Sequence, residues 1–360
     1  MADTSIAKEQ RTAAFNRWKA RLTMGPKQFV RRIATAWSPL ADLYYAIFDR
    51  SFAREHRGVL HGTRRYHELH QQGAANRFQL RRNTHRLEKG LLMKPRRDVF
   101  AIGYLQEMMD AYELGLASIG AGGDSEEIRW SHDVLTEYFS VCGPNEVVDV
   151  QRARFEALPP ISRPADEPAS VPYQRDLDGP LPVEFEAFQK LAKRRRSVRW
   201  FLDTPVPREL VDQAIVAAAE APSACNRQPF HFRVFDDPEL VQTVSTLPMG
   251  TKGFAHNFPM IVVVVGQLRA YFKPRDRHLI YIDGSLASMS FMFALETLGL
   301  SSCPINWPDI PAREKQMAKQ LNLEPDQRPI MLIAIGYPDP DGAVAFSHKQ
   351  SLDHLRSYNK

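Results

Sequence analysis

Two stretches decide how this chain folds: Arg195-Arg196-Ser197-Val198-Arg199 and, further along, Ala221-Pro222-Ser223-Ala224-Cys225-Asn226-Arg227-Gln228-Pro229-Phe230. The first places three guanidinium groups and a hydroxyl within five residues, which suits a phosphate because arginine binds phosphate through two hydrogen bonds. In the second, Asn226 and Gln228 offer amide donors and acceptors, and prolines stop regular structure on either side. Together they predict a site for a phosphorylated ligand with a polar ring edge.

The order of the segments that follow indicates the kind of domain to which these two stretches belong. An alternating segment at 230–235 and apolar runs at 259–265 and 330–336 predict strands, and residues 282–300 predict a helix. Two further motifs are Cys303-Pro304-Ile305-Asn306-Trp307 and His348-Lys349. Because helix and strand signals alternate with short connections, residues 184–360 predict a domain of mixed helix and sheet.

This succession resembles the FMN-dependent nitroreductase family. The resemblance implies an α+β fold for residues 184–360, with a nitroreductase-like, mainly antiparallel sheet flanked by helices. It also implies a homodimer with two FMN sites at its interface. The implied reaction is ping-pong hydride transfer, in which NADH or NADPH reduces FMN and an electron-poor acceptor then takes the electrons. Nitroaromatics, quinones and biosynthetic intermediates are acceptors of this kind.

The resemblance assigns cofactor contacts residue by residue. Arg195, Ser197 and Arg199 match the string that contacts FMN in the family. Asn226 and Gln228 match the family segment Pro-Ser-x-x-Asn-x-Gln-Pro, in which the Asn contacts the flavin ring or the ribityl chain. These five residues are therefore predicted to bind FMN.

A third motif implies the catalytic position. Pro304, Ile305 and Asn306 lie where the family lays backbone over one face of the flavin and offers an amide N–H to N5, so Ile305 and Asn306 are the predicted catalytic residues. Such a donor stabilises the charge and protonation changes at N5. Trp307, which departs from the glycine common in relatives, either covers the ring or fills the core. Lys349 lies where a late basic residue of the family reaches the FMN phosphate.

A part of different composition precedes this domain. Residues 1–157 predict an all-α domain, with helices at 1–24, 39–52, 64–89, 98–116 and 125–139. Residues 158–183 are rich in proline and show little apolar periodicity, so they predict a linker.

The charge is unevenly distributed. Residues 1–100 hold 21 Lys and Arg against 8 Asp and Glu, a balance of +13, and the whole chain carries +5, so residues 101–360 sum to −8. The basic part either binds an anionic ligand or a membrane surface, or docks onto the acidic part. The alternative to a general oxidoreductase is therefore a catalytically specialised or inactive flavin-domain scaffold whose basic helical half binds an anionic partner. Five arginines are candidates for binding an anionic substrate or for internal salt bridges: Arg81, Arg82, Arg86, Arg96 and Arg97.

Other site classes find little support. Three scattered cysteines predict neither a disulfide framework nor a thiolate metal site. His85 and Glu88 share a helical face, which suits a hydrogen-bonded pair or one edge of a metal site, but the histidine spacing matches no zinc pattern, and no metal is predicted. Asp283 is interpreted as part of a helix N-terminal cap. With no signal peptide or membrane span recognised, the expected location is the cytoplasm.

Overall fold

The computed structural model describes residues 29–71, 76–119, 123–163 and 166–359. Contacts divide the chain into two compact units, residues 1–57 and 58–360. The described part of the first unit contains α2 (Ser38–Ile47) and the 3-10 helix η1 (Arg50–Phe52). The predicted helix at 1–24 lies outside the described residues.

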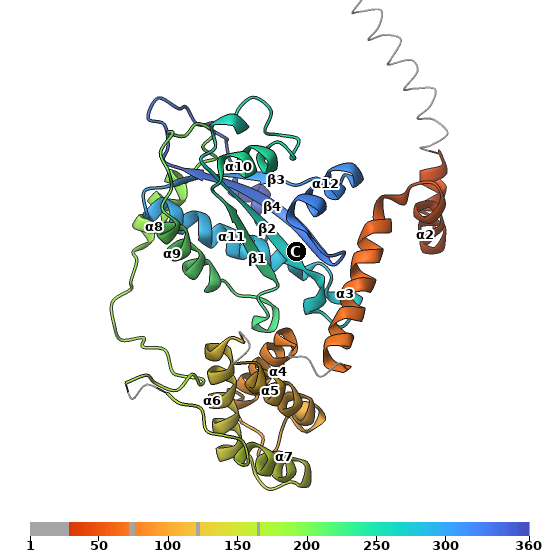
Figure 1. Cartoon of the computed structure of the whole chain (residues 1–360), viewed down its shortest axis with the longest axis vertical. Coiled ribbons are helices and arrows are strands. Elements are labelled where there is room, and N and C mark those ends of the chain that lie inside the picture. Colours follow the sequence, from red (N-terminus) through yellow and green to blue (C-terminus); the bar gives the residue numbers. More distant parts are fainter. Residues whose placement is uncertain (1–28, 72–75, 120–122, 164–165, 360) are drawn as a thin grey trace, which may run out of the picture. The chain divides into compact units, whose positions relative to one another are not determined.

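The second unit begins with a helical segment, as the sequence predicts. Its helices are α3 (Ala53–Gln71), whose first residues belong to the first unit, α4 (Arg77–Leu91), α5 (Leu105–Ser118), α6 (Ser125–Val141) and α7 (Glu146–Glu156) (Figure 1). The helical region predicted over 64–89 contains parts of two helices, α3 and α4, and α7 has no counterpart among the predicted helices. Helices α4, α5 and α6 share an apolar core that includes Leu87, Met108, Tyr112, Leu135 and Tyr138, all fully buried.

Side-chain caps define where these helices begin. Asn76 accepts a hydrogen bond from the Gln79 amide at the start of α4, and the Asp124 carboxylate accepts from Glu126 and Glu127 at the start of α6. Each cap satisfies amide groups that have no partner inside the helix. The polar residues before each apolar stretch therefore fix the register of α4 and α6.

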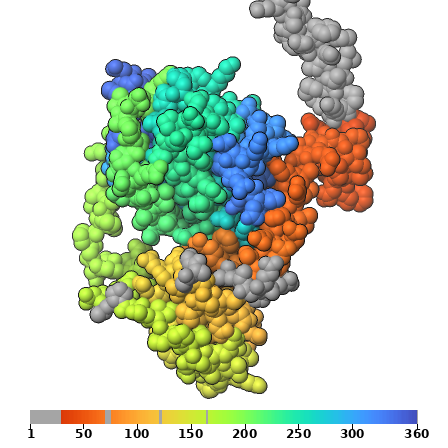
Figure 2. All heavy atoms as spheres, in the orientation of Figure 1, coloured from red at the N-terminus to blue at the C-terminus, as the bar shows by residue number. Residues whose placement is uncertain are grey.

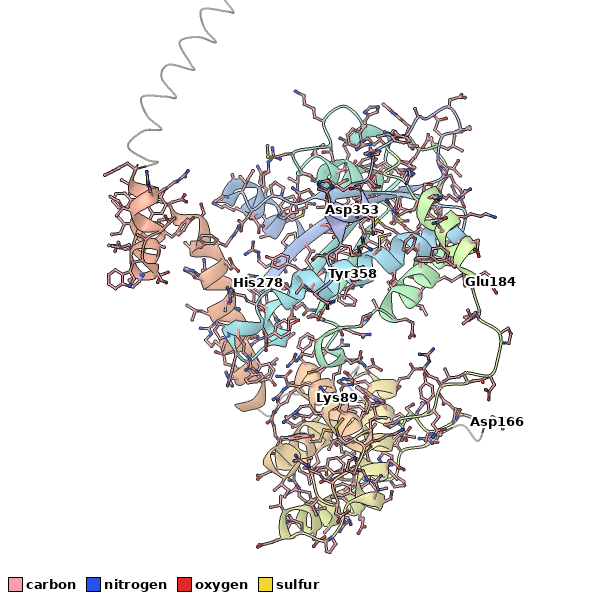
Figure 3. The ribbon with its side chains drawn as sticks, turned by 180° about the vertical axis from the view of Figure 1, so that it is seen from behind. Lys89, Asp166, Glu184, His278, Asp353 and Tyr358 are labelled. Atoms are coloured by element: carbon pink, nitrogen blue, oxygen red, sulfur yellow. The ribbon has the colours of Figure 1, made fainter. Side chains whose placement is uncertain are left out.

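The proline-rich segment between α7 and α8 (Phe185–Arg194) contains no helix or strand in its described residues. Figure 3 shows it as an extended chain from the region of Asp166 to Glu184. It is nonetheless attached, because the buried Asp133 carboxylate on α6 accepts hydrogen bonds from Arg163 and from the Ser170 amide, the latter at 2.8 Å. The segment is thus held to the helical part along one side.

The remainder of the unit is built around one sheet. Its strands are β1 (Phe230–Phe235), β2 (Met260–Gln267), β3 (Ser301–Asn306) and β4 (Gln327–Gly336), and their spatial order is β1-β2-β4-β3. Every neighbouring pair is antiparallel. The predicted α+β class with a mainly antiparallel sheet is confirmed. Strands β1, β2 and β4 lie at the three predicted strand segments, whereas β3, which carries the motif at 303–306, is not among the predicted strands.

Both faces of the sheet are covered (Figure 1). Met260, Val262 and Val264 of β2 pack into one core with α9 (Arg208–Ala219) and α11 (Leu279–Thr297). The alternate residues Ile261 and Val263 pack into the other core, with α10 (Pro238–Ser245) and α12 (Pro311–Leu321). Because successive side chains of a strand point to opposite faces, an unbroken apolar run satisfies both cores.

One helical stretch, Pro274–Thr297, is long and apolar enough to cross a membrane by length and composition alone. It contains α11, whose residues Ala287, Phe291 and Leu295 are fully buried against the sheet. The apolar length of this stretch is therefore accounted for by its place in the core.

Candidate functional site

The first arginine string lies beside the edge strand β3. Arg195 ends α8, and the chain then runs extended so that Ser197 and Ser302 form a parallel bridge. The Val198 amide donates to the Ser302 carbonyl over 3.1 Å. Two of the predicted motifs, 195–199 and 304–306, are therefore brought to the same edge of the sheet.

Two polar atoms at this bridge have no partner. The Oγ of Ser302 and the Nε of Arg195 are both buried and make no hydrogen bond. A buried polar atom without a partner costs roughly 1–3 kcal/mol, so each needs an explanation, and a ligand that supplies the missing bond is one. A hydroxyl and a guanidinium fit the ribityl and phosphate groups of FMN. Ser302 was not among the predicted site residues, because a serine at the start of an apolar strand carries no motif of its own.

The third motif runs along β3 from this bridge. Four residue steps separate Ser302 from Asn306, which at about 3.3 Å per residue is about 13 Å of strand. Ile305 is buried in the sheet core, whereas Asn306, at the end of the strand, is exposed. Trp307 is buried, and its indole donates to Glu314 over 2.8 Å. Of its two predicted roles, Trp307 therefore fills the core.

The second motif forms a loop with an unusual backbone. Cys225, Asn226 and Gln228 have φ values of 53°, 50° and 48°, in the left-handed region, with right-handed Arg227 between the last two. Left-handed backbone costs non-glycine residues about 1–2 kcal/mol each, and such strain concentrates at ligand sites. Alternating left- and right-handed residues also aim successive amides into one concavity, which favours anions. Gln228 itself donates from its side chain to the Ala219 carbonyl at 2.9 Å.

Asp283 anchors this loop, and its predicted role as a helix cap is wrong. Helix α11 begins at Leu279, so Asp283 lies inside it and is buried. Its carboxylate accepts from the Ala224 amide at 3.0 Å, and the Tyr271 hydroxyl lies 3.5 Å away. Burial raises the pKa of Asp283 above its usual value. The Asp-Gly-Ser run has residue types typical of a helix N-terminus, but the apolar residues before it are already helical, so α11 begins at Leu279.

The loop and the arginine string lie at opposite edges of the sheet. The loop leads into β1, the string lies along β3, and β2 and β4 separate the two strands. Three strand spacings amount to about 14 Å. The pairing register places the start of β1 and the end of β3 toward the same end of the sheet, through Phe230 opposite Gly266 and Asn306 opposite Met331.

The helical segment contacts the loop directly. Arg81 on α4 donates from Nε to the Asn226 carbonyl over 2.7 Å, and from Nη1 to Glu127 over 3.2 Å. Both charged groups of this pair are buried, and burial lowers the pKa of Arg81 and raises that of Glu127. In the space-filling view, the helical and sheet-bearing segments of this unit are in contact (Figure 2). The sequence offered no signal for this long-range contact.

Besides Asn306, two predicted cofactor residues are exposed. Arg199 donates from Nη1 to the Ser197 carbonyl at 3.3 Å, and its guanidinium lies 5.7 Å from the Phe254 ring centre. Lys349 lies in the exposed coil after β4, and within the described residues no recorded contact joins it to Arg195 or Ser197. The structure therefore leaves the predicted phosphate contact of Lys349 untested.

One cluster of side chains has the spacing of metal ligands. His61, Glu324 and Asp326 offer ligand atoms within 4.8 Å of one another. Arg269, however, pairs with Asp326 through two bonds of 2.6 Å and with Glu324 at 2.9 Å, so both carboxylates already carry a counter-ion.

The predicted pair on α4 is formed. His85 Nδ1 lies 3.0 Å from one oxygen of Glu88, and the Trp130 indole donates to the other at 3.0 Å. The geometry supports the hydrogen-bonded interpretation of this pair, and both oxygens of Glu88 are engaged.

Sequence comparison matches the C-terminal half of the chain to a known protein family. Residues 192–249 and 241–337 match the model of the nitroreductase family, which confirms the predicted resemblance in this half of the chain. Iodotyrosine deiodinase 1 of Sus scrofa is 23% identical over 201 residues, covering 47% of this chain and 68% of that protein. The iodotyrosine deiodinase of Thermotoga neapolitana is 27% identical over 173 residues, covering 41% of this chain and 87% of that protein.

Solved structures are also similar. An FMN-dependent nitroreductase from Clostridium difficile R20291 is 24% identical, covers 47% of this chain and 98% of that chain, and has a TM-score of 0.41.

Proposed function

Because residues 192–337 form a nitroreductase-family domain, we propose that this protein is an FMN-dependent oxidoreductase that transfers hydride from NADH or NADPH to an electron-poor acceptor. The observation that carries the proposal is the bridge between Ser197 and Ser302, beside which Arg195 Nε and Ser302 Oγ are buried without partners. When bound, FMN supplies the redox chemistry, taking a hydride equivalent from the donor and passing it to the acceptor. The residues of this chain bind and orient it.

In this proposal, each motif has its own task. Arg195, Ser197 and Arg199 hold the phosphate and the ribityl chain, and the backbone at Ile305 and Asn306 donates to the flavin ring. Lys349 adds a phosphate contact. The motif from Asn226 to Gln228 supplies polar contacts from a strained loop that Asp283 and Arg81 hold in place.

We propose that two copies of the chain complete each site. The loop before β1 and the string along β3 lie at opposite edges of one sheet, which favours a site assembled from two subunits. An uncovered apolar surface supports this: no residue of α8 is buried, and its Phe185 and Phe188 are 67% and 47% exposed directly before Arg195. A homodimer removes such a surface from water.

The first experiment is to purify the protein, record its absorbance spectrum before and after denaturation, and identify the released flavin. We expect about one FMN per subunit. Ser197→Ala and Arg195→Gln lower the FMN content, while Arg208→Gln, which removes an exposed guanidinium on α9, leaves it unchanged. A protein that retains no flavin after incubation with excess FMN contradicts the proposal and favours the scaffold alternative.

Two relatives named iodotyrosine deiodinase favour reductive dehalogenation as a second candidate. In that reaction an aryl iodide accepts two electrons and a proton, and iodide leaves. Release of iodide from an iodinated phenol by the reduced holoprotein, with no turnover of nitroaromatics or quinones, supports this candidate. The reverse pattern supports the first.

A further inference from the structure

A cavity of about 650 Å³ lies in the helical segment of the second unit, away from the bridge at Ser197. Its volume falls within the range of small-molecule sites. Helices α3, α4, α5 and α7 contribute to its walls, together with the turn at Ile102–Tyr104 and Phe272 from the segment before α11. Figure 3 shows α4, marked by Lys89, among these helices.

The cavity combines aromatic walls with one guanidinium. Tyr66, Tyr104 and Phe272 line it, and the Arg82 guanidinium lies 4.6 Å from the Phe272 ring centre. The recorded hydrogen bonds of Arg82, to Asn83 and Glu107, both use Nη1. Among the described contacts no geometric hydrogen bond uses Nε or Nη2. The buried Tyr66 hydroxyl interacts electrostatically with this guanidinium, so the two groups together are available to a planar anion such as a carboxylate.

The acidic groups of the cavity wall have cationic partners. Glu107 accepts from Gln79 over 2.8 Å and from Arg82 and Asn83 over 3.2 and 3.3 Å. Asp110, also in the lining, pairs with Arg154 at 2.9 Å, and Arg154 is shared with Glu113 at 3.0 Å. Each carboxylate of the lining therefore has a guanidinium partner.

A second cation increases the positive charge at one wall. The guanidinium of Arg86 lies 3.4 Å from the ring centre of Tyr104, and its recorded hydrogen bond goes to the neutral Asn83. Arg82 and Arg86 thus stand close to Glu107, whereas Asp110 is held by Arg154 at a separate point of the wall. Burial lowers the pKa of Arg86, and so does the neighbouring charge of Arg82. An anion placed here relieves that repulsion.

The cavity adjoins the loop of the proposed flavin site. Arg82 lines the cavity, and the preceding residue Arg81 holds the Asn226 carbonyl. Phe272 lines the cavity, and the preceding residue Tyr271 lies under the Arg227 guanidinium at 5.2 Å. In each of these two segments, one residue lies in the cavity wall and the residue before it contacts residues 226–227.

We propose that this cavity binds a small aromatic anion, with the ring between the aromatic walls and the anionic group on Arg82. The five candidate arginines of the sequence then separate into four groups. Arg82 contacts the ligand and Arg86 supports it from behind Tyr104, whereas Arg81 is committed to Glu127 and Asn226. Arg96 and Arg97 are exposed and lie outside the cavity.

The test is calorimetric titration of the full-length protein with 4-nitrobenzoate and with nitrobenzene, which has the same ring but no charge. No electron donor is added, so binding is measured independently of flavin chemistry. We expect 4-nitrobenzoate to bind at least about ten-fold more tightly than nitrobenzene, and Arg82→Gln to weaken it about ten-fold. Arg96→Gln leaves the affinity unchanged.

A cavity-filling variant makes the test independent of the Arg82 ion pair. A Cβ on Gly103, which lines the cavity, meets no atom within 4 Å, so Gly103→Leu fills space without a clash. Gly250 is equally open and lies outside the cavity lining, and Gly250→Leu is the matched control. We expect Gly103→Leu to abolish binding and Gly250→Leu to preserve it.

Three results overturn the proposal: no binding of 4-nitrobenzoate, equal affinity for nitrobenzene, or unchanged binding in Gly103→Leu. Because the flavin content of each sample is read separately from its spectrum, a protein without FMN that still binds 4-nitrobenzoate refutes the proposed function alone. A flavoprotein without this binding refutes the cavity alone.

Discussion

The Nε of Arg81 on α4 donates to the carbonyl oxygen of Asn226 over 2.7 Å, which ties the helical segment to the loop that carries the second sequence motif. The same guanidinium is buried against Glu127. One side chain therefore stabilises both a helix pair and a strained loop.

Arg81→Met tests this link. Removing one partner of a buried ion pair costs about 3–5 kcal/mol, because the other charge stays buried. We expect a loss of that order in the free energy of unfolding, measured by urea denaturation, together with weaker retention of FMN. The exposed Arg96→Met is the control and leaves both unchanged. A destabilised variant that retains FMN as tightly as the parent protein shows that the loop does not depend on α4.

Asp283→Ala and Asp283→Asn separate the hydrogen bond of Asp283 from its charge. Alanine leaves the Ala224 amide without its acceptor, which costs about 1–3 kcal/mol, whereas asparagine retains an acceptor. Burial raises the pKa of Asp283 above 3.8, so the folded state holds this proton more tightly than the unfolded state. The parent protein therefore loses stability relative to Asp283→Asn as pH rises from 3.8 through the folded-state pKa. Urea denaturation from pH 4 to pH 7 measures this, and a pH-independent difference between the two proteins contradicts it.

His132→Gln is expected to flatten the stability profile on the acid side. Burial lowers the pKa of His132 below 6.5, although Asp133 raises it and Arg163 lowers it further. The unfolded chain binds this proton more readily, so the parent protein loses stability as pH falls below 6.5 and retains it above. Thermal denaturation between pH 5 and pH 7 measures the slope. His354→Gln, at an exposed histidine, serves as the comparison and retains the slope of the parent protein.

Gly62→Ala is expected to destabilise the protein even though alanine favours helix. A Cβ at Gly62 would lie 2.7 Å from the backbone carbon of Leu268, and backbone cannot move as a side-chain tip can. We expect a loss of about 1–3 kcal/mol in the free energy of unfolding. Gly103→Ala, with open space around its Cβ, is the matched variant and stays within about 0.5 kcal/mol of the parent protein. Equal stability of the two variants shows that α3 is not packed closely against residue 268.

The sequence predicts the strands of the sheet better than the surroundings of the site. An unbroken apolar run such as 260–265 suits a strand buried on both faces, so periodicity and composition locate it directly. The start of α11 is predicted less well. His278, its N-cap residue, makes no side-chain cap, whereas the Asp-Gly-Ser run inside the helix imitates one.

The motifs identify residues but not their distant partners. Ser197 and Asn226 are found because they belong to recognisable motifs. Nothing in the sequence around Ser302 shows that it pairs with Ser197, and nothing around Arg81 shows that it contacts Asn226. For the same reason, the sequence alone does not assign a role to each of the candidate arginines. Arg81 and Arg82 are adjacent in sequence, and only the direction of each side chain from α4 separates a structural ion pair from a cavity wall.

The antiparallel pairing of β2 with β4 has a consequence for synthesis on the ribosome. β1 is made shortly before β2 and pairs with it early, but the other edge of β2 waits for residues 327–336 to leave the exit tunnel. During that interval the run Ile261–Val265 presents an unpaired, valine-rich edge of the kind that seeds aggregation. The yield of soluble protein in a heterologous host therefore depends on translation speed and chaperone supply between these two strands.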